Sequence, residues 1–241
     1  MGRQAMKKNQ SEEKAMSEIP RIVALVPMRD QSERVPGKNY RELAGAPLFH
    51  HIMSALQACP EIAEVAVDTD SATIKASLTE HFPKVSIIDR PQHLLEGEIP
   101  MNDILMHDTQ QVSADYYLQT HSTNPLLRSE TISAAIVAFL AEVPSKDSLF
   151  SVTALQTRLY DLEGNAINHN SGELLRTQDL PPIYEENSCI YLFSRQSLEK
   201  QGHRMGEDPM MFPILAEEAW DIDEEIDFQV ADFLMRQRGK S

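Results

Sequence analysis

The sequence predicts an α/β fold in which a mostly parallel sheet is flanked by helices. Short apolar runs alternate with segments of helical periodicity between residues 22 and 143. Polar and charged side chains follow several of these runs, where open α/β sheets bind their ligands. After residue 147 the alternation gives way to short strands and turns. The length of 241 residues suits a single domain at residues 21–241, preceded by a flexible polar leader at residues 1–20.

The composition limits the classes of partner. Lysine and arginine number 22 against 37 aspartate and glutamate residues, which gives a net charge of −15. A protein this acidic is not expected to bind nucleic acid or an anionic membrane. We expect no membrane helix, which needs roughly 20 apolar residues, and no secretory signal. Two cysteines provide neither a disulfide framework nor a zinc-binding spacing, so we expect a cytoplasmic protein.

The first half of the chain is predicted to form four strand–helix units. The uninterrupted apolar run at residues 22–26 predicts a buried strand, and apolar residues recur at helical spacing over residues 47–58. A short strand at residues 65–67 ends in Asp68 and Asp70, either of which can cap the next helix. That helix is expected at residues 72–81, with further strands at residues 85–88 and 115–119 and further helices at residues 101–111 and 129–143.

The second half departs from this rhythm. Alternating apolar residues predict a strand at residues 149–155, and short strands are expected at residues 158–160 and 166–168 around a Glu-Gly-Asn turn. A further strand is expected at residues 189–193 and a closing helix at residues 224–236. We expect residues 148–190 to form a small β-rich excursion from the main sheet, which serves as a lid or as a dimer contact.

The loop after the first predicted strand has an unusual content. It carries the cations Arg29, Arg34 and Lys38, the hydroxyl of Ser32 and a Pro-Gly turn. Backbone N–H groups and cations in such a loop can bind a phosphate chain. The Gly-Lys-Ser/Thr ending of a Walker A loop is missing, and so is a dinucleotide fingerprint. A solvated charged loop is the alternative interpretation.

An aspartate pair precedes the closing helix. Asp221 and Asp223 are separated by one apolar residue, so in an extended segment they face the same side. Two carboxylates placed in this way can hold Mg²⁺, which prefers oxygen ligands. The alternative is that they only favour the helix dipole, which explains residues inside the helix better than residues before it.

The pattern of residues 29–39, Arg-x-x-Ser-x-Arg-x-Pro-Gly-Lys-Asn, resembles the CTP loop of the acylneuraminate cytidylyltransferases, the CMP-N-acylneuraminate synthetase family. Three more blocks follow in the family's order: residues 67–70, residues 123–128 and the Asp-x-Asp of residues 221–223. The resemblance implies a Rossmann-like fold of the nucleotide-diphospho-sugar transferase type and a homodimer. It implies transfer of CMP from CTP to the anomeric hydroxyl of an acidic, sialic-acid-like 3-deoxy-ulosonic sugar, with Mg²⁺ as the cofactor.

The resemblance also implies roles for individual residues. The catalytic residues would be Arg29, Lys38 and Asp223, with Asp221 and Asp223 holding the metal. The nucleotide would be bound by Arg29, Ser32, Lys38, Asn39, Arg90 and Asn102. The acidic sugar would be bound by His121, Thr123, Arg176 and Asn187.

The chain departs from the family pattern in the region of the sugar. His121 stands where glutamine is typical, and residues 185–188, Glu-Glu-Asn-Ser, replace the common Arg-Pro-Asn-Gly. In the phosphate loop, Asp30 and Glu33 make the charge less positive than is usual. The acceptor therefore stays open between a sialic acid, a pseudaminic- or legionaminic-type acid, 3-deoxy-manno-octulosonate and a phosphonate. A different nucleoside triphosphate and a non-catalytic nucleotide-binding module are the remaining alternatives.

Overall fold

The computed structural model describes residues 20–30, 34–173 and 175–238. The leader expected at residues 1–20 lies outside this part of the chain except for Pro20, and Ser32 lies outside it as well. None of the described helices is both long and apolar enough to cross a bilayer.

A seven-stranded sheet forms the centre of the molecule, in the order β5-β4-β1-β6-β8-β7-β9. Parallel pairing joins β1 to β4 and β6, β4 to β5, and β7 to β9, whereas β8 runs antiparallel to both of its neighbours. The predicted α/β fold with a mostly parallel sheet is confirmed. The strands are β1 (Ile22–Leu25), β4 (Ile62–Thr69), β5 (Ser86–Asp89), β6 (Tyr116–Gln119), β7 (Ser148–Leu155), β8 (Ile183–Phe193) and β9 (Pro209–Pro213).

Helices cover both faces of the sheet because its central strands are apolar on both sides. Ala24 and Val26 pack with α2 (Leu48–Gln57), α3 (Ala72–His81) and α5 (Ser129–Glu142), as parts of one core cluster. Val23 and Leu25 belong to a second cluster on the opposite face, with residues of α4 (Met101–Gln111) and α6 (Arg195–Gln201). The continuous apolar run at the start of the chain is thus a fully buried strand, as predicted.

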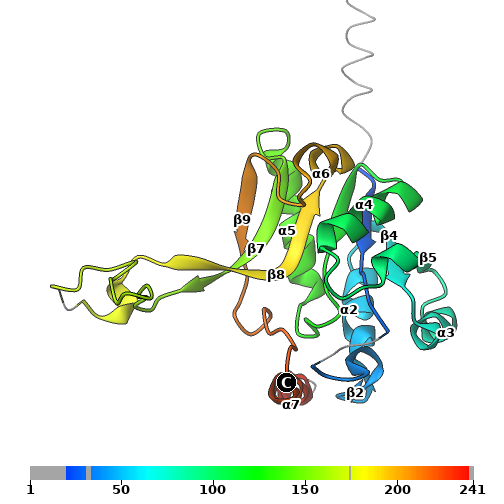
Figure 1. Ribbon diagram of the computed structural model, residues 1–241, viewed down its shortest axis with the longest axis horizontal. Helices are drawn as coiled ribbons and strands as arrows, with labels where there is room; N and C mark the ends of the chain where they lie inside the picture. The colour runs from blue at the N-terminus through cyan, green and yellow to red at the C-terminus, as the bar shows by residue number, and fades with distance from the viewer. Residues whose placement is uncertain (1–19, 31–33, 174, 239–241) are drawn as a thin grey trace, which may run out of the picture.

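The closing helix α7 (Glu225–Arg238) packs at the edge of the domain (Figure 1). Its residues Phe228 and Ala231 form a third cluster with Leu43, Leu48 and Ile222. Leu43 lies in the small hairpin of β2 (Glu42–Leu43) and β3 (Ala46–Pro47). This packing brings the end of the chain back to the loop that follows β1. The described residues also form three short 3-10 helices: η1 (Lys38–Tyr40), η2 (Gln92–Leu94) and η3 (Thr177–Asp179).

The β-rich excursion is present, but its predicted bounds at residues 148–190 are wrong. The inner parts of β7 and β8 belong to the main sheet, where β8 pairs with β6 through residues 191–193. Only their outer parts and the chain between them project from the body as a long arm (Figure 1). The predicted short strands at residues 158–160 and 166–168 reduce to one isolated bridge between Tyr160 and Ala166.

Candidate active site

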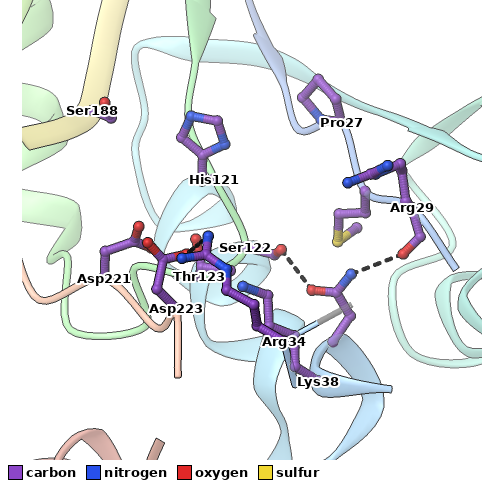
Figure 2. A pocket seen from close by; sticks show the side chains of 12 residues that line it. Pro27, Arg29, Arg34, Lys38, His121, Ser122, Thr123, Ser188, Asp221 and Asp223 are labelled. Carbon is purple, nitrogen blue, oxygen red and sulfur yellow. Dashed lines mark hydrogen bonds and ion pairs between the residues drawn. The ribbon is translucent and has the colours of Figure 1, made fainter. Parts of the chain in front are cut away.

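A cavity of about 470 Å³ opens at the carboxyl ends of β1 and β6. Figure 2 shows Asp221 and Asp223 beside Arg34 and Lys38, with Arg29 farther across the cavity. Four segments that lie far apart in the sequence therefore meet: the loop after β1, the loop after β6, β8 and the segment before α7. The cationic loop and the aspartate pair therefore converge on one cavity. The lining residues are Pro27, Met28, Arg29, Arg34, Lys38, Asn39, His121, Ser122, Thr123, Ser188, Asp221 and Asp223.

Lys38 enters the cavity from η1. Gly37 precedes it with a φ of 64°, in the left-handed region that favours glycine. A Cβ at Gly37 would lie 2.7 Å from the ring of Tyr40, so a side chain at this position would also displace that ring. The Nζ of Lys38 donates a hydrogen bond of 2.5 Å to the carbonyl of Ile222. Burial lowers the pKa of Lys38, while Asp221 and Asp223 act in the opposite direction.

Asn39 fixes the loop after β1 to the loop after β6. Its Nδ2 donates to the carbonyl of Arg29 at 3.1 Å, and its Oδ1 accepts from the Ser122 hydroxyl at 2.8 Å (Figure 2). Asn39 is 7% exposed, so these bonds replace bonds to water. In this structure the amide of Asn39 positions Arg29, whereas a contact with the nucleotide base stays a prediction.

The aspartate pair is presented by a buried isoleucine. Ile222 is fully buried, and its N–H donates to the carbonyl of Thr123 at 3.0 Å. The neighbouring side chains Asp221 and Asp223 therefore both face the cavity. Burial and then the nearby charge of Asp223 raise the pKa of Asp221, although a hydrogen bond from Thr123 acts against them. Arg34 forms an ion pair of 2.6 Å with Asp223.

These residues fit a hard divalent cation. Two carboxylates share one side of the cavity, and their mutual repulsion contributes to the raised pKa of Asp221. A cation between them would relieve that repulsion, and phosphate oxygens of a ligand could complete an oxygen-rich set. Asp221 and Asp223 are the residues that would hold Mg²⁺.

The start of α7 is fastened to the same loop region. Arg41 forms two hydrogen bonds, of 2.6 and 2.9 Å, with the carboxylate of Glu225, and its guanidinium lies 4.1 Å from the centre of the Phe228 ring. The carboxylate of Asp227 accepts from the backbone N–H groups of Asp223 and Glu224, which caps the helix. These contacts determine where the aspartate pair lies relative to Lys38.

A bulge in β8 brings Ser188 to the cavity. Ser188 has a φ of 58°, which is unusual for a residue other than glycine, and the register with β7 shifts here. Asn187 stabilises the bulge, because its Oδ1 accepts from Ser151 at 2.5 Å and its Nδ2 donates to Thr153 at 3.0 Å. Asn187 was predicted to bind the sugar, but it lines a neighbouring hollow and Ser188 lines the cavity.

Three other predicted site residues lie outside the cavity. Asn102 accepts a hydrogen bond of 3.1 Å from the backbone N–H of Arg204. Arg176 lies on the arm, where its guanidinium binds the Asp179 carboxylate at 2.6 and 3.0 Å. The side chain of Arg90 is 1% exposed and is paired with Asp68. None of these three residues lines the cavity, and the predicted role of Ser32 falls outside the described residues.

Arg90 belongs to a second charged cluster beneath the end of β4. Ligand atoms of Asp68, His107 and Asp108 lie within 4.8 Å of one another, a spacing that a metal ion could bridge. The guanidinium of Arg90 already supplies a cation to Asp68, and a second cation beside it would be repelled. Burial and then the nearby Asp68 raise the pKa of Asp108, so a protonated Asp108 carboxyl group fits this cluster better than a metal.

Arg34, Ser122 and Ser188 line the cavity without being among the predicted site residues. The sequence did indicate Arg34 as a candidate, because it is one of the three cations of the loop after β1. Ser122 and Ser188 could be placed only once the pairing of their segments was known. Ser122 depends on its contact with Asn39, and Ser188 depends on the bulge.

The fold and the cavity together define a class of protein. Cations and carboxylates converge at the carboxyl ends of parallel strands, as in α/β enzymes that bind nucleotides. A family model described as cytidylyltransferase matches residues 23–238. The chain belongs to this cytidylyltransferase family and is a nucleotidyltransferase of the acylneuraminate cytidylyltransferase type.

Relatives and solved structures agree with this placement. The chain is 30% identical to a CMP-N,N'-diacetyllegionaminic acid synthase of Legionella pneumophila, over 89% of this chain and 96% of the relative. It is 24% identical to the post-translational flagellin modification protein B of Campylobacter coli, over 90% and 96% of the two chains. A CMP:2-keto-3-deoxy-manno-octonic acid synthetase structure complexed with CTP superposes with a TM-score of 0.69 at 16% identity, covering 90% of this chain and 99% of that one. The last likeness supports the fold.

Proposed function

We propose that this chain transfers CMP from CTP to the anomeric hydroxyl of an acidic 3-deoxy-ulosonic sugar and releases pyrophosphate. The observation that carries the proposal is the convergence of Arg29, Lys38 and the aspartate pair on one cavity. Cations suit the triphosphate, and a pair of carboxylates suits the magnesium ion that accompanies it. The relatives support the acceptor class, because one is named a legionaminic acid synthase and others are named N-acylneuraminate cytidylyltransferases. In this proposal, CTP of the cytoplasm donates the CMP group.

In the proposed reaction, the anomeric oxygen bonds to the α-phosphorus of CTP while the bond to the pyrophosphate oxygen breaks. The hydroxyl proton passes to solvent. Charge builds on the phosphoryl oxygens, where Arg29 and Lys38 would stabilise it by electrostatics. Mg²⁺ held by Asp221 and Asp223 would supply Lewis-acid stabilisation of the same charge. His121, Thr123 and Ser188 also line the cavity and would orient the acceptor.

The acceptor within this class is tested by a panel. Purified protein with Mg²⁺ is incubated with each of the four nucleoside triphosphates and each of several acids: N-acetylneuraminic, legionaminic, pseudaminic and 3-deoxy-manno-octulosonic acid. We expect pyrophosphate release with CTP and at least one nine-carbon acid. Release with a triphosphate other than CTP, or no release with any acid, would contradict the proposal.

We propose that the protein is a homodimer and that the arm forms the contact. The arm projects from the body (Figure 1). Large apolar residues are exposed on it, among them Tyr160, Leu162 and Ile167. Exposed apolar side chains grouped in this way mark protein interaction surfaces.

A further inference from the structure

His121 is joined to a buried arginine by a continuous chain of hydrogen bonds. Arg204 donates from its guanidinium to the Oε1 of Gln119 at 2.6 Å. The Nε2 of Gln119 lies 3.0 Å from the carbonyl of Thr120 and 3.2 Å from the Nε2 of His121. Gln119 is fully buried in β6, so its amide bonds to the protein rather than to water. The chain ends at the cavity that His121 lines.

The orientation of the Gln119 amide follows from its partners. Arginine has donors and no acceptor, so the amide oxygen must face Arg204. The amide NH₂ has two hydrogens. The carbonyl of Thr120 is an acceptor and binds one of them. A flipped amide would place oxygen against the Thr120 carbonyl and NH₂ against the guanidinium, so both contacts would be lost.

The second amide hydrogen of Gln119 then determines the tautomer of His121. Because Gln119 donates, the Nε2 of His121 must accept and carries no hydrogen. A neutral imidazole of this kind carries its hydrogen on Nδ1. Burial and then the nearby Arg204 and Lys38 lower the pKa of His121 to about 4, so the ring is neutral in the physiological range.

The position of Arg204 is itself determined by several contacts. Its guanidinium lies 3.6 Å from the centre of the Tyr191 ring. The hydroxyl of Tyr191 bonds to Glu186 and lies 3.1 Å from the hydroxyl of Ser188, another residue of the cavity wall. The backbone N–H of Arg204 is held by Asn102. Arg204 thus links two sides of the cavity wall without lining the cavity.

We propose that Arg204 and Gln119 are positioning residues, which lock His121 in the Nδ1–H tautomer so that it donates a hydrogen bond to the carboxylate of the acidic acceptor. This inference rests on the proposed function, because the acceptor is the ligand. The chemistry of the ligand follows from the donor, since Nδ1–H needs an acceptor atom. It also follows from the two nearby cations, Lys38 and Arg204, which favour an anion. The Gln119–Arg204 pair would explain how histidine serves where glutamine is typical.

The Gln119→Glu variant tests whether Gln119 fixes the tautomer of His121, because glutamate and glutamine side chains have nearly the same shape. Glutamate still accepts from Arg204, but it cannot donate to His121, so the imidazole must place a hydrogen on Nε2 instead. We expect the KM for the acid to rise about tenfold or more, as for a lost hydrogen bond to a charged group, while the KM for CTP stays within twofold. Gln111→Glu is the matched control, because Gln111 is exposed on α4, and it should change neither KM.

The tautomer is measured directly by the ¹⁵N shifts of the ring nitrogens, with the His121 signals identified by their absence in His121→Asn. We expect a protonated Nδ1 and an unprotonated Nε2 in the wild-type protein, and the reverse in Gln119→Glu. In the His121→Asn background, which has no tautomer to lock, Gln119→Glu should cause no further rise in the KM for the acid.

A wild-type ring with its hydrogen on Nε2 would overturn the inference, and so would an unchanged KM for the acid in Gln119→Glu. If the wild-type protein is inactive towards every acid of the panel, the proposed function fails instead. The ring-nitrogen shifts still decide the tautomer in that case, and they do so even if Gln119→Glu does not fold.

Discussion

Asp108 carries a buried carboxyl group that lies beside the carboxyl group of Asp68. It is 1% exposed, and neither of its side-chain oxygens has a hydrogen-bond partner among the described residues. Burial and the neighbouring Asp68 raise the pKa of Asp108 to about 9. The folded protein therefore keeps a proton that an unfolded aspartate releases near pH 4. The stability of the fold is expected to depend on this proton.

The sign of that dependence can be tested with Asp108→Asn. Below about pH 4 both states hold the proton, and the full stability is present. As the pH rises toward the folded pKa of about 9, the unfolded state alone loses its proton and stability falls. The amide that Asp108→Asn introduces has no such proton to lose, so the variant should exceed the wild type in free energy of unfolding by at least about 1 kcal/mol at pH 8. The measurement is urea unfolding between pH 4.5 and 8.5.

The control for this comparison is Asp103→Asn, an exposed position on the same helix. It should shift stability equally at all of these pH values. A difference between Asp108→Asn and the wild type that does not grow with pH would show that the Asp108 carboxyl is already ionised in the folded protein.

At the scale of elements, the short segment before α7 decides where the two carboxylates lie. Ile222 anchors that segment in a cluster with Phe228 and Leu43. Ile222→Ala leaves a cavity there and should cost about 2–5 kcal/mol of stability, whereas Ile222→Val should cost about 0.5–1.5 kcal/mol. Both variants should also raise the Mg²⁺ concentration that half-saturates activity, in the same order. Denaturant unfolding and a Mg²⁺ titration of pyrophosphate release measure the two effects.

Ile226→Ala is the matched control, because Ile226 lies on α7 but is 58% exposed. It should change stability by less than about 0.5 kcal/mol. If Ile222→Ala destabilised the fold while its Mg²⁺ dependence stayed that of the wild type, the segment would not position the carboxylates.

Elements with a local signal could be predicted from the sequence. β1 is one uninterrupted apolar run, and α5 begins and ends within one residue of the expected bounds. β9 and α6 were not predicted. β9 is an edge strand bounded by prolines at Pro209 and Pro213, and its pairing with β7 is a long-range contact. α6 has only seven residues, and such short helices owe their stability to packing rather than to periodicity.

The same limit applies to the candidate site. Arg29, Lys38, Asp221 and Asp223 could be found because polar residues at strand ends and before a helix are local features. The surroundings of Arg90 could not be predicted, because the partner that buries it, Asp68, lies 22 residues earlier in the chain. The role proposed for Gln119 and Arg204 depends on the hydrogen bond between their side chains. These two residues lie 85 positions apart in the sequence, so no local pattern indicates the contact.

At the scale of the whole molecule, the arm is expected to hold two copies together. Leu162, in the turn of the arm closed by the Gly164 N–H and the Asp161 carbonyl, is 98% exposed, and it is grouped with other exposed apolar residues of the arm. We expect the wild-type protein to have about twice the monomer mass in solution, by light scattering after size exclusion. Leu162→Asp combined with Ile167→Asp should shift it to the monomer mass. The pair Leu215→Asp and Val137→Asp, exposed on the body, should leave the dimer intact. A wild-type monomer at micromolar concentration would contradict the proposed contact.

We propose that residues from the two ends of the domain form one nucleotidyl-transfer site. The most direct test is pyrophosphate release by Asp223→Asn with CTP, Mg²⁺ and the acid that the wild-type protein prefers. We predict that kcat falls about 100-fold or more while the unfolding curve stays that of the wild type, and that Glu224→Gln, one residue farther along, keeps near-normal activity. Pyrophosphate release by Asp223→Asn at the wild-type rate would show that the aspartate pair takes no part in the reaction.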